Sequence, residues 1–142
     1  MSKFYAFMKK NKIEKENVLY PATESLRDEN GKPLMWELRP LTTKEYEALS
    51  QSCMREVPVK GKAGQYRPKL DTTSFQAKMI CKSIVSPDLD DSELQDSYGV
   101  MGAEELLREM INIPGEFTDL AVKVQQISGF KSMDEEVNEA KN

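Results

Sequence analysis

Apolar residues recur three or four positions apart along several short stretches of this sequence, and proline or glycine ends most of these stretches. That spacing places apolar side chains on one face of an α-helix. In the last stretch, Pro114 suits a first helical position and Gly129 suits a C-cap. The expected buried stripe of this helix is Phe117, Leu120, Val124 and Ile127. The pattern predicts a mainly helical protein, and 142 residues are enough for one domain with a buried core.

Capping signals predict where the other helices begin. Thr42 and Glu45 form a capping-box pattern, in which a hydroxyl and a carboxylate satisfy free backbone N–H groups, and this helix is expected to run to about Arg55. Asp71 and Asp91 open two further helices. The expected helical segments are 3–11, 43–55, 71–86, 91–99, 103–111 and 114–129. The first of them would carry Phe4, Phe7 and Met8 on one side.

Segments 18–26 and 33–39 predict a β-hairpin, for which two registers compete. A two-residue Asn-Gly turn would set the apolar residues of the second segment opposite polar ones. A three-residue loop, Glu29-Asn30-Gly31, instead pairs Leu34 with Leu26 and Leu38 with Ala22, and places glycine at the left-handed position. We therefore expect the three-residue loop.

In this register Trp36 points inward as a core anchor. The predicted fold class is therefore α+β, mainly α-helical: a single domain of about five to six helices with an N-terminal β-hairpin. We place the domain at residues 1–130. Residues 131–142 form a polar, acidic C-terminal tail that we expect to be flexible.

Charge is distributed unevenly along the chain. Residues 1–70 hold 14 Lys and Arg against 9 Asp and Glu, whereas residues 71–142 hold 6 against 15. Residues 56–70 form a predicted basic loop interrupted by Pro58, Gly61, Gly64 and Pro68. Two interpretations stay open: the charges are solvated helix faces, or opposite ends attract one another within one chain or between copies in a homo-oligomer.

The residue types present exclude much chemistry. Histidine is absent, so the sequence offers no imidazole base, no Ser-His or Cys-His pair and no usual zinc cluster. No glycine-rich phosphate loop occurs either. We therefore predict a protein that is not an enzyme, uses no cofactor or metal, and works by binding other proteins.

Composition also bears on partners and compartment. The acidic net charge of −4 and the lack of a basic recognition helix argue against nucleic-acid binding. No apolar run approaches the ~20 residues that cross a bilayer, and residues 1–12 show no secretory signal. Cys53 and Cys81 are expected to be reduced thiols in a cytosolic protein.

Four stretches together match a known pattern. They are Phe4-Tyr5-Ala6-Phe7-Met8 with Asn11-Lys12; Asp28-Glu29-Asn30-Gly31-Lys32-Pro33 leading to Trp36-Glu37-Leu38-Arg39 and Leu41-Thr42; Glu104-Glu105-Leu106-Leu107; and Pro114-Gly115-Glu116-Phe117 with Gly129-Phe130. In order and spacing the chain resembles, over about residues 1–130, the XkdN-like tail assembly chaperones encoded by phages and prophages of Gram-positive bacteria.

This resemblance implies a chaperone that binds the tape measure protein and helps recruit tail tube subunits during phage tail morphogenesis. It would act in the host bacterial cytoplasm and be absent from the mature virion. The alternatives are a structural component of the phage tail or connector, and a host-directed protein-binding regulator. Virion proteomics separates a chaperone from a structural component, because a chaperone should be missing from purified tails.

The candidate partner-binding residues are the apolar side chains near the C-terminus, Phe130, Met133 and Val137. Met133 and Val137 are four residues apart, so a helix would place them on one face. An unstructured tail could become ordered on a helical partner through these side chains. An idle, solubilising tail is the competing interpretation.

Related chaperones are often made in two lengths through ribosomal frameshifting. Ala140-Lys141-Asn142 is compatible with the codons GCA-AAA-AAC, which contain a slippery heptamer. Because each codon has synonyms, the protein sequence permits this heptamer without showing it. The gene sequence decides whether a longer product exists.

Overall fold

The computed structural model describes residues 2–131, and within them helices dominate. The α-helices in this part of the chain are α1 (Thr43–Ser52), α2 (Thr72–Ser83), α3 (Ser92–Ser97), α4 (Ala103–Met110) and α5 (Pro114–Ile127). β1 (Val18–Tyr20), β2 (Trp36–Leu38) and β5 (Ile84–Ser86) form one antiparallel sheet in the order β1-β2-β5. β3 (Met54–Pro58) and β4 (Tyr66–Leu70) form a second one. The predicted α+β class with mainly helical content is confirmed.

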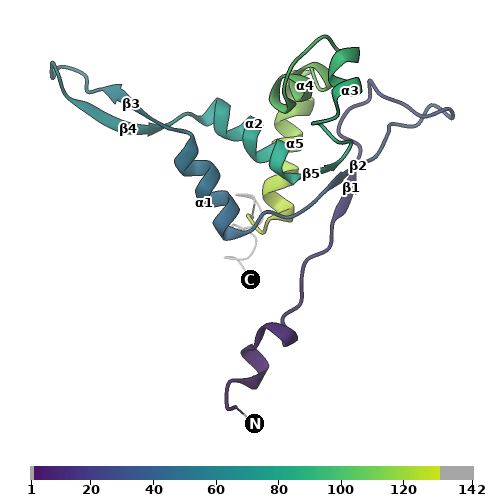
Figure 1. The fold of residues 1–142 in the computed structure, drawn as a ribbon, viewed down its shortest axis with the longest axis horizontal. Helices are drawn as coiled ribbons and strands as arrows, with labels where there is room; N and C mark the ends of the chain where they lie inside the picture. The colour runs from purple at the N-terminus through teal and green to yellow at the C-terminus, as the bar shows by residue number, and fades with distance from the viewer. Residues whose placement is uncertain (1, 132–142) are drawn as a thin grey trace, which may run out of the picture.

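The core is organised around α2, which packs against α1, α4, α5 and β5 (Figure 1). Its side chains at helical spacing, Phe75, Met79 and Ile80, are buried. Leu120 and Val124 of the α5 stripe are fully buried, and Phe117 and Ile127 pack against the core at its edge. Burial of this apolar surface is the main term that stabilises the fold.

Local signals explain where these helices begin and end. Thr42 and Glu45 make the predicted capping box at the start of α1, and Asp71 accepts the Ser74 amide at the start of α2. Pro114 is the first residue of α5. At its end, Gly129 has φ +99° and donates to the Gln126 carbonyl, while Phe130 donates to the Gln125 carbonyl. This pair of bonds is a Schellman motif, which satisfies carbonyls that the helix leaves free.

The hairpin prediction is correct at its turn and wrong at its far end. The Asp28 amide donates to the Lys32 carbonyl and the Leu34 amide to the Leu26 carbonyl, as a Glu29-Asn30-Gly31 loop requires. Leu38, however, pairs with Val18 and not with Ala22. Residues 21–25, which lie between the Tyr20–Trp36 pair and the Leu26–Leu34 hydrogen bond, are not paired with the second strand.

An interaction with α5 explains this excursion. Glu116, in the first turn of α5, accepts hydrogen bonds from the Thr23 hydroxyl at 2.7 Å and from the Glu24 amide at 2.9 Å. Thr23 and Ala22 are thereby buried against the body of the protein. These bonds also hold the pKa of Glu116 below its usual range. Trp36 is 2% exposed, which confirms its predicted place in the core.

The predicted helix over residues 3–11 is wrong. Two short 3₁₀ turns, Tyr5–Phe7 and Lys9–Asn11, are separated by Met8 in an extended conformation. Every residue from 2 to 17 is exposed, and Figure 1 shows this N-terminal arm extending away from the body. No core contact therefore supports a helix there, and short helices are marginal without such contacts.

The predicted loop over residues 56–70 is wrong, because most of it forms two strands. The helix expected to reach Arg55 ends at Ser52, where the first of these strands follows. β3 and β4 pair from Met54 with Leu70 to Pro58 with Tyr66, and only the tip between them is a turn. The Asp71 amide donates to the Cys53 carbonyl, which closes the base of the ribbon. Similarly, α2 ends at Ser83 and not at Ser86, because Ile84–Ser86 form β5 against β2.

Candidate partner-binding surface

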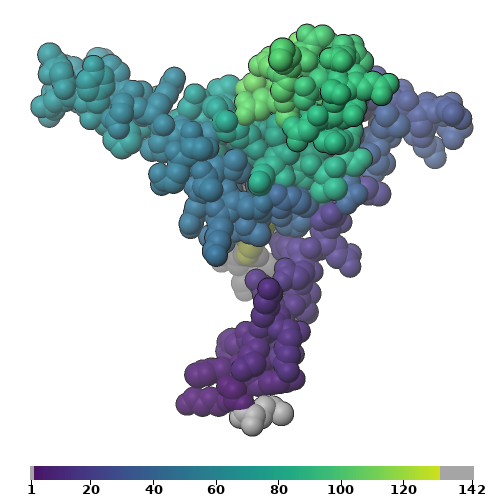
Figure 2. All heavy atoms as spheres, viewed as in Figure 1, coloured from purple at the N-terminus to yellow at the C-terminus, as the bar shows by residue number. Residues whose placement is uncertain are grey.

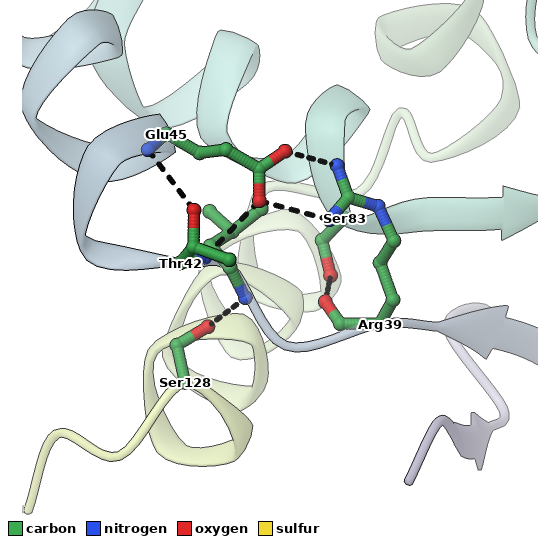
Figure 3. A network of polar contacts seen from close by, with 6 residues as sticks. Arg39, Thr42, Glu45, Ser83 and Ser128 are labelled. Atoms are coloured by element: carbon green, nitrogen blue, oxygen red, sulfur yellow. Dashed lines mark hydrogen bonds and ion pairs between the residues drawn. The ribbon is translucent and has the colours of Figure 1, made fainter. Parts of the chain in front are cut away.

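A network of polar contacts fixes the place where β2, α1, α2 and α5 meet (Figure 3). The Ser83 hydroxyl, at the end of α2, donates to the Arg39 carbonyl at 2.7 Å. The Leu41 amide donates to the Ser128 hydroxyl at the end of α5 at 3.0 Å. The segment between β2 and α1 is thus tied to two helix ends that are distant in sequence. Each bond satisfies a backbone group that would otherwise be left unpaired near the core.

Arg39 and Glu45 complete this network. The Arg39 guanidinium donates to both carboxylate oxygens of Glu45, at 3.0 and 2.6 Å. The Glu45 carboxylate also accepts from the Thr42 amide at 3.1 Å. The hydrogen bond from Arg39 is the main reason why the pKa of Glu45 falls to about 2. A two-pronged, charge-assisted contact of this kind orients the start of α1.

Three aromatic side chains gather beside this network. The Tyr46 ring, on α1, lies 5.2 Å from the Phe75 ring of α2 and 5.0 Å from the Phe130 ring, measured between centroids. Phe75 is buried, Tyr46 is half-buried and Phe130 is 47% exposed. We call these three residues the aromatic cluster. It runs from the core to the surface, and its outer member is held by the Schellman motif that ends α5.

Tyr46 lies between two surface grooves. The larger, of about 470 Å³, is lined mainly by α2 and α5, and its apolar lining is Tyr46, Leu70, Phe75, Met79, Ala121 and Val122. The smaller, of about 190 Å³, is bounded by Tyr46, Phe130 and the polar residues Thr42, Thr43, Glu47 and Ser128. An apolar floor with a polar rim is the usual composition of a surface that binds a helix or an extended peptide.

Of the predicted partner-binding residues, only Phe130 lies within the described part of the chain, and it is placed at this surface. Met133 and Val137 lie outside the described residues, as does Ala140-Lys141-Asn142. The sequence interpretation missed Tyr46 and Phe75 as neighbours of Phe130. No spacing along the chain connects these two residues, in α1 and α2, to a residue after α5.

Across residues 2–131, no three or more acidic or cysteine side chains are grouped as metal ligands would be. Cys53 and Cys81 are free, and burial raises the pKa of Cys81 to about 12. The same residues contain no helix that is long and apolar enough to span a bilayer.

Comparison with known proteins identifies the family. A family model described as phage XkdN-like tail assembly chaperone protein matches residues 4–141. The Bacillus subtilis (strain 168) phage-like element PBSX protein XkdN is 28% identical over 96% of this chain and 91% of its own length. The protein YqbN of the same strain is 26% identical over 94% of this chain and 89% of its own length.

A crystal structure of YqbN shares the fold, with a TM-score of 0.72 over 92% of this chain and 99% of that chain at 21% identity. The agreement extends over almost the whole length of both molecules, so the fold is common to the two as a unit. Together with the match of the family model to residues 4–141, this shows that the chain belongs to the phage XkdN-like tail assembly chaperone family.

Proposed function

We propose that this protein binds the tape measure protein during phage tail assembly and helps recruit tail tube subunits to it. It acts by binding rather than catalysis, in the host bacterial cytoplasm, and is absent from the finished virion. Family membership supports the general role. The observation that carries the client-binding step is the exposed Phe130 at the end of the aromatic cluster, where it lines the smaller groove and packs on Tyr46, which lines both grooves.

The physical argument rests on what a long apolar client needs from a chaperone. Exposed apolar surface on the client is covered when side chains such as Phe130 pack against it, and removing this area from water supplies the binding free energy. The half-buried Tyr46 and buried Phe75 hold the site rigid from behind. A pre-ordered aromatic side chain loses little conformational entropy on binding.

Co-expression with the tape measure protein of the same phage tests the proposal. We expect the wild-type chain to keep that protein in the soluble fraction and Phe130→Ala to lower its soluble yield severalfold. Deletion of residues 131–142 tests the contribution of Met133 and Val137 in the same assay. Met101→Ala is the matched control, because Met101 is 90% exposed on the loop before α4.

Two results would contradict the proposal. The first is equal client solubility with and without this protein. The second is the presence of this protein in purified tails by mass spectrometry, which would make it a structural component. If Phe130→Ala and Met101→Ala behaved alike while wild type solubilised the client, the role would stand and the assigned surface would be wrong.

A further inference from the structure

The β3–β4 ribbon projects from the body of the protein, and Figures 1 and 2 show it extending to one side beyond α1 and α2. Its strands pair with each other from Met54–Leu70 at the base to Pro58–Tyr66 near the tip. All of its residues are exposed except the half-buried Val57, Val59 and Leu70. A two-stranded ribbon alone in water is marginally stable, so a ribbon like this one gains from a partner surface.

The strand register gives the ribbon two different faces. Side chains alternate between faces along each strand, and residues directly opposite each other share a face. The pairs Arg55–Lys69 and Val57–Arg67 therefore lie on one face, which carries three cations around one valine. The other face carries Met54, Glu56, Pro58, Tyr66, Pro68 and Leu70. We call the first the basic face.

The cations of the basic face have few carboxylate partners in the described part of the chain. Arg55 and Lys69 are directly opposite, an arrangement of like charges that destabilises a strand pair. Arg55 has an acidic partner, Asp71, at 4.0 Å. In the described part of the chain Arg67, Lys69 and the tip residues Lys60 and Lys62 make no ion pair. A negatively charged partner surface would relieve the repulsion between these cations and give them ion pairs.

The chain itself presents a surface of the opposite charge. No Lys or Arg occurs from Ser83 to Leu107, and Asp88, Asp90, Asp91, Glu93 and Asp96 are all exposed there. These five carboxylates, which we call the acidic end, lie on α3 and the loop before it. None of them takes part in an ion pair among residues 2–131. Figure 1 places α3 on the far side of α2 from the ribbon, so the two surfaces do not meet within one molecule.

We propose that the basic face of one copy binds the acidic end of a second copy. Because the two surfaces are different and lie on different sides of the molecule, the contact is head-to-tail, and each added copy leaves one free surface of each kind. The charges on both sides are exposed, so the association weakens as salt screens them. The contact does not use Phe130, Tyr46, Phe75 or the α5 residues that line the two grooves, so these stay available in each copy.

Charge reversal tests this contact without any client, so its outcome is independent of the proposed function. Sedimentation of the wild-type full-length chain at high protein concentration should show assemblies in low salt and monomers in about 1 M NaCl, where screening acts over about 3 Å. The ribbon variant Arg67→Glu/Lys69→Glu leaves one cation and two carboxylates on the basic face. The acidic-end variant Asp90→Lys/Glu93→Lys/Asp96→Lys leaves two carboxylates and three cations on the acidic end. Each variant should associate with itself at least about tenfold more weakly than wild type does.

Mixing the two variants is the decisive step. The reversed ribbon of the first variant is acidic and can bind the reversed, basic end of the second variant. The unchanged acidic end of the first can bind the unchanged basic face of the second. Assembly should therefore return in the mixture. The matched control is Lys9→Glu/Lys12→Glu, which makes the same change in net charge on the N-terminal arm and should associate like wild type. Circular dichroism shows that each variant folds.

Three outcomes would overturn the inference. A wild-type chain that stays monomeric in low salt has no such contact. Ribbon and arm variants that associate equally well show that the ribbon is not the contact surface. A mixture of the two reversed variants that stays monomeric shows that the ribbon and the acidic end do not bind each other.

Discussion

At the scale of single residues, Glu45 ties the segment after β2 to the start of α1. Its carboxylate receives both guanidinium bonds from Arg39 and the amide of Thr42, and these bonds hold its pKa at about 2 against an ordinary value of 4.5. A carboxyl group whose pKa is lower in the folded state stabilises the fold above its unfolded pKa. This stabilisation is therefore complete above about pH 5 and is lost as the pH falls through the folded value.

The substitution Glu45→Gln should lower the free energy of unfolding at pH 7 by about 2 kcal/mol. This is the size expected for hydrogen bonds to a charged group that is partly exposed to solvent. The difference from wild type should shrink between about pH 4.5 and pH 2, where wild type loses the same charge. Urea unfolding at a series of pH values measures this. Glu47→Gln, exposed on the same helix, is the control and should change little. A pH-independent difference would mean that the charge on Glu45 is not the cause.

At the scale of elements, the end of α5 determines where Phe130 lies. Gly129 adopts φ +99°, a conformation that costs about 1–2 kcal/mol for a residue with a Cβ atom. Gly129→Ala should therefore lower the free energy of unfolding by about that amount and displace Phe130 from Tyr46. Denaturant unfolding measures the first effect, and the client-solubility assay described above measures the second.

Gly115→Ala is the matched control for Gly129→Ala. Gly115 lies in the first turn of α5 with a negative φ, and an added Cβ there would meet nothing within 4 Å. Alanine restricts the unfolded chain and favours the helix, so this variant should be as stable as wild type or up to about 1 kcal/mol more stable. Equal destabilisation by both substitutions would contradict the role given to the Schellman motif.

The same elements show how far the sequence predicts this fold. Thr42 and Glu45, Asp71, Pro114 and Gly129 act on backbone groups within a few residues, so the helix boundaries that depend on them could be predicted. The turn at Glu29-Asn30-Gly31 is equally local, and its prediction is confirmed. The position of Trp36 follows from that turn and the alternation of its strand.

The wrong predictions depend on contacts between distant residues. Leu38 pairs with Val18 because Glu116, some ninety positions later, binds Thr23 and Glu24. β5 continues directly from α2, and only its pairing with β2 makes it a strand. The aromatic cluster joins α1, α2 and the residue after the Schellman glycine, and so could not be found from spacing along the chain.

At the scale of the whole molecule, three segments leave a helical body: the N-terminal arm, the hairpin between β1 and β2, and the β3–β4 ribbon (Figures 1 and 2). The arm differs from the other two, because its residues 2–17 are all exposed and Phe7 is 85% exposed. Among the described residues, the contacts of its aromatic side chains are with near neighbours, as Phe4 packs with Phe7. The arm therefore contributes little to the stability of the isolated protein.

Deletion of residues 2–12 tests this directly and should change the free energy of unfolding by less than about 0.5 kcal/mol, as expected where no buried contact is removed. The deletion keeps Lys15, whose ammonium group lies 3.4 Å from the Ile127 carbonyl at the end of α5. Trp36→Ala serves as the opposite control, because truncating this buried ring should cost about 3–5 kcal/mol. A loss of more than about 1 kcal/mol on deleting the arm would show that it packs on the body in solution.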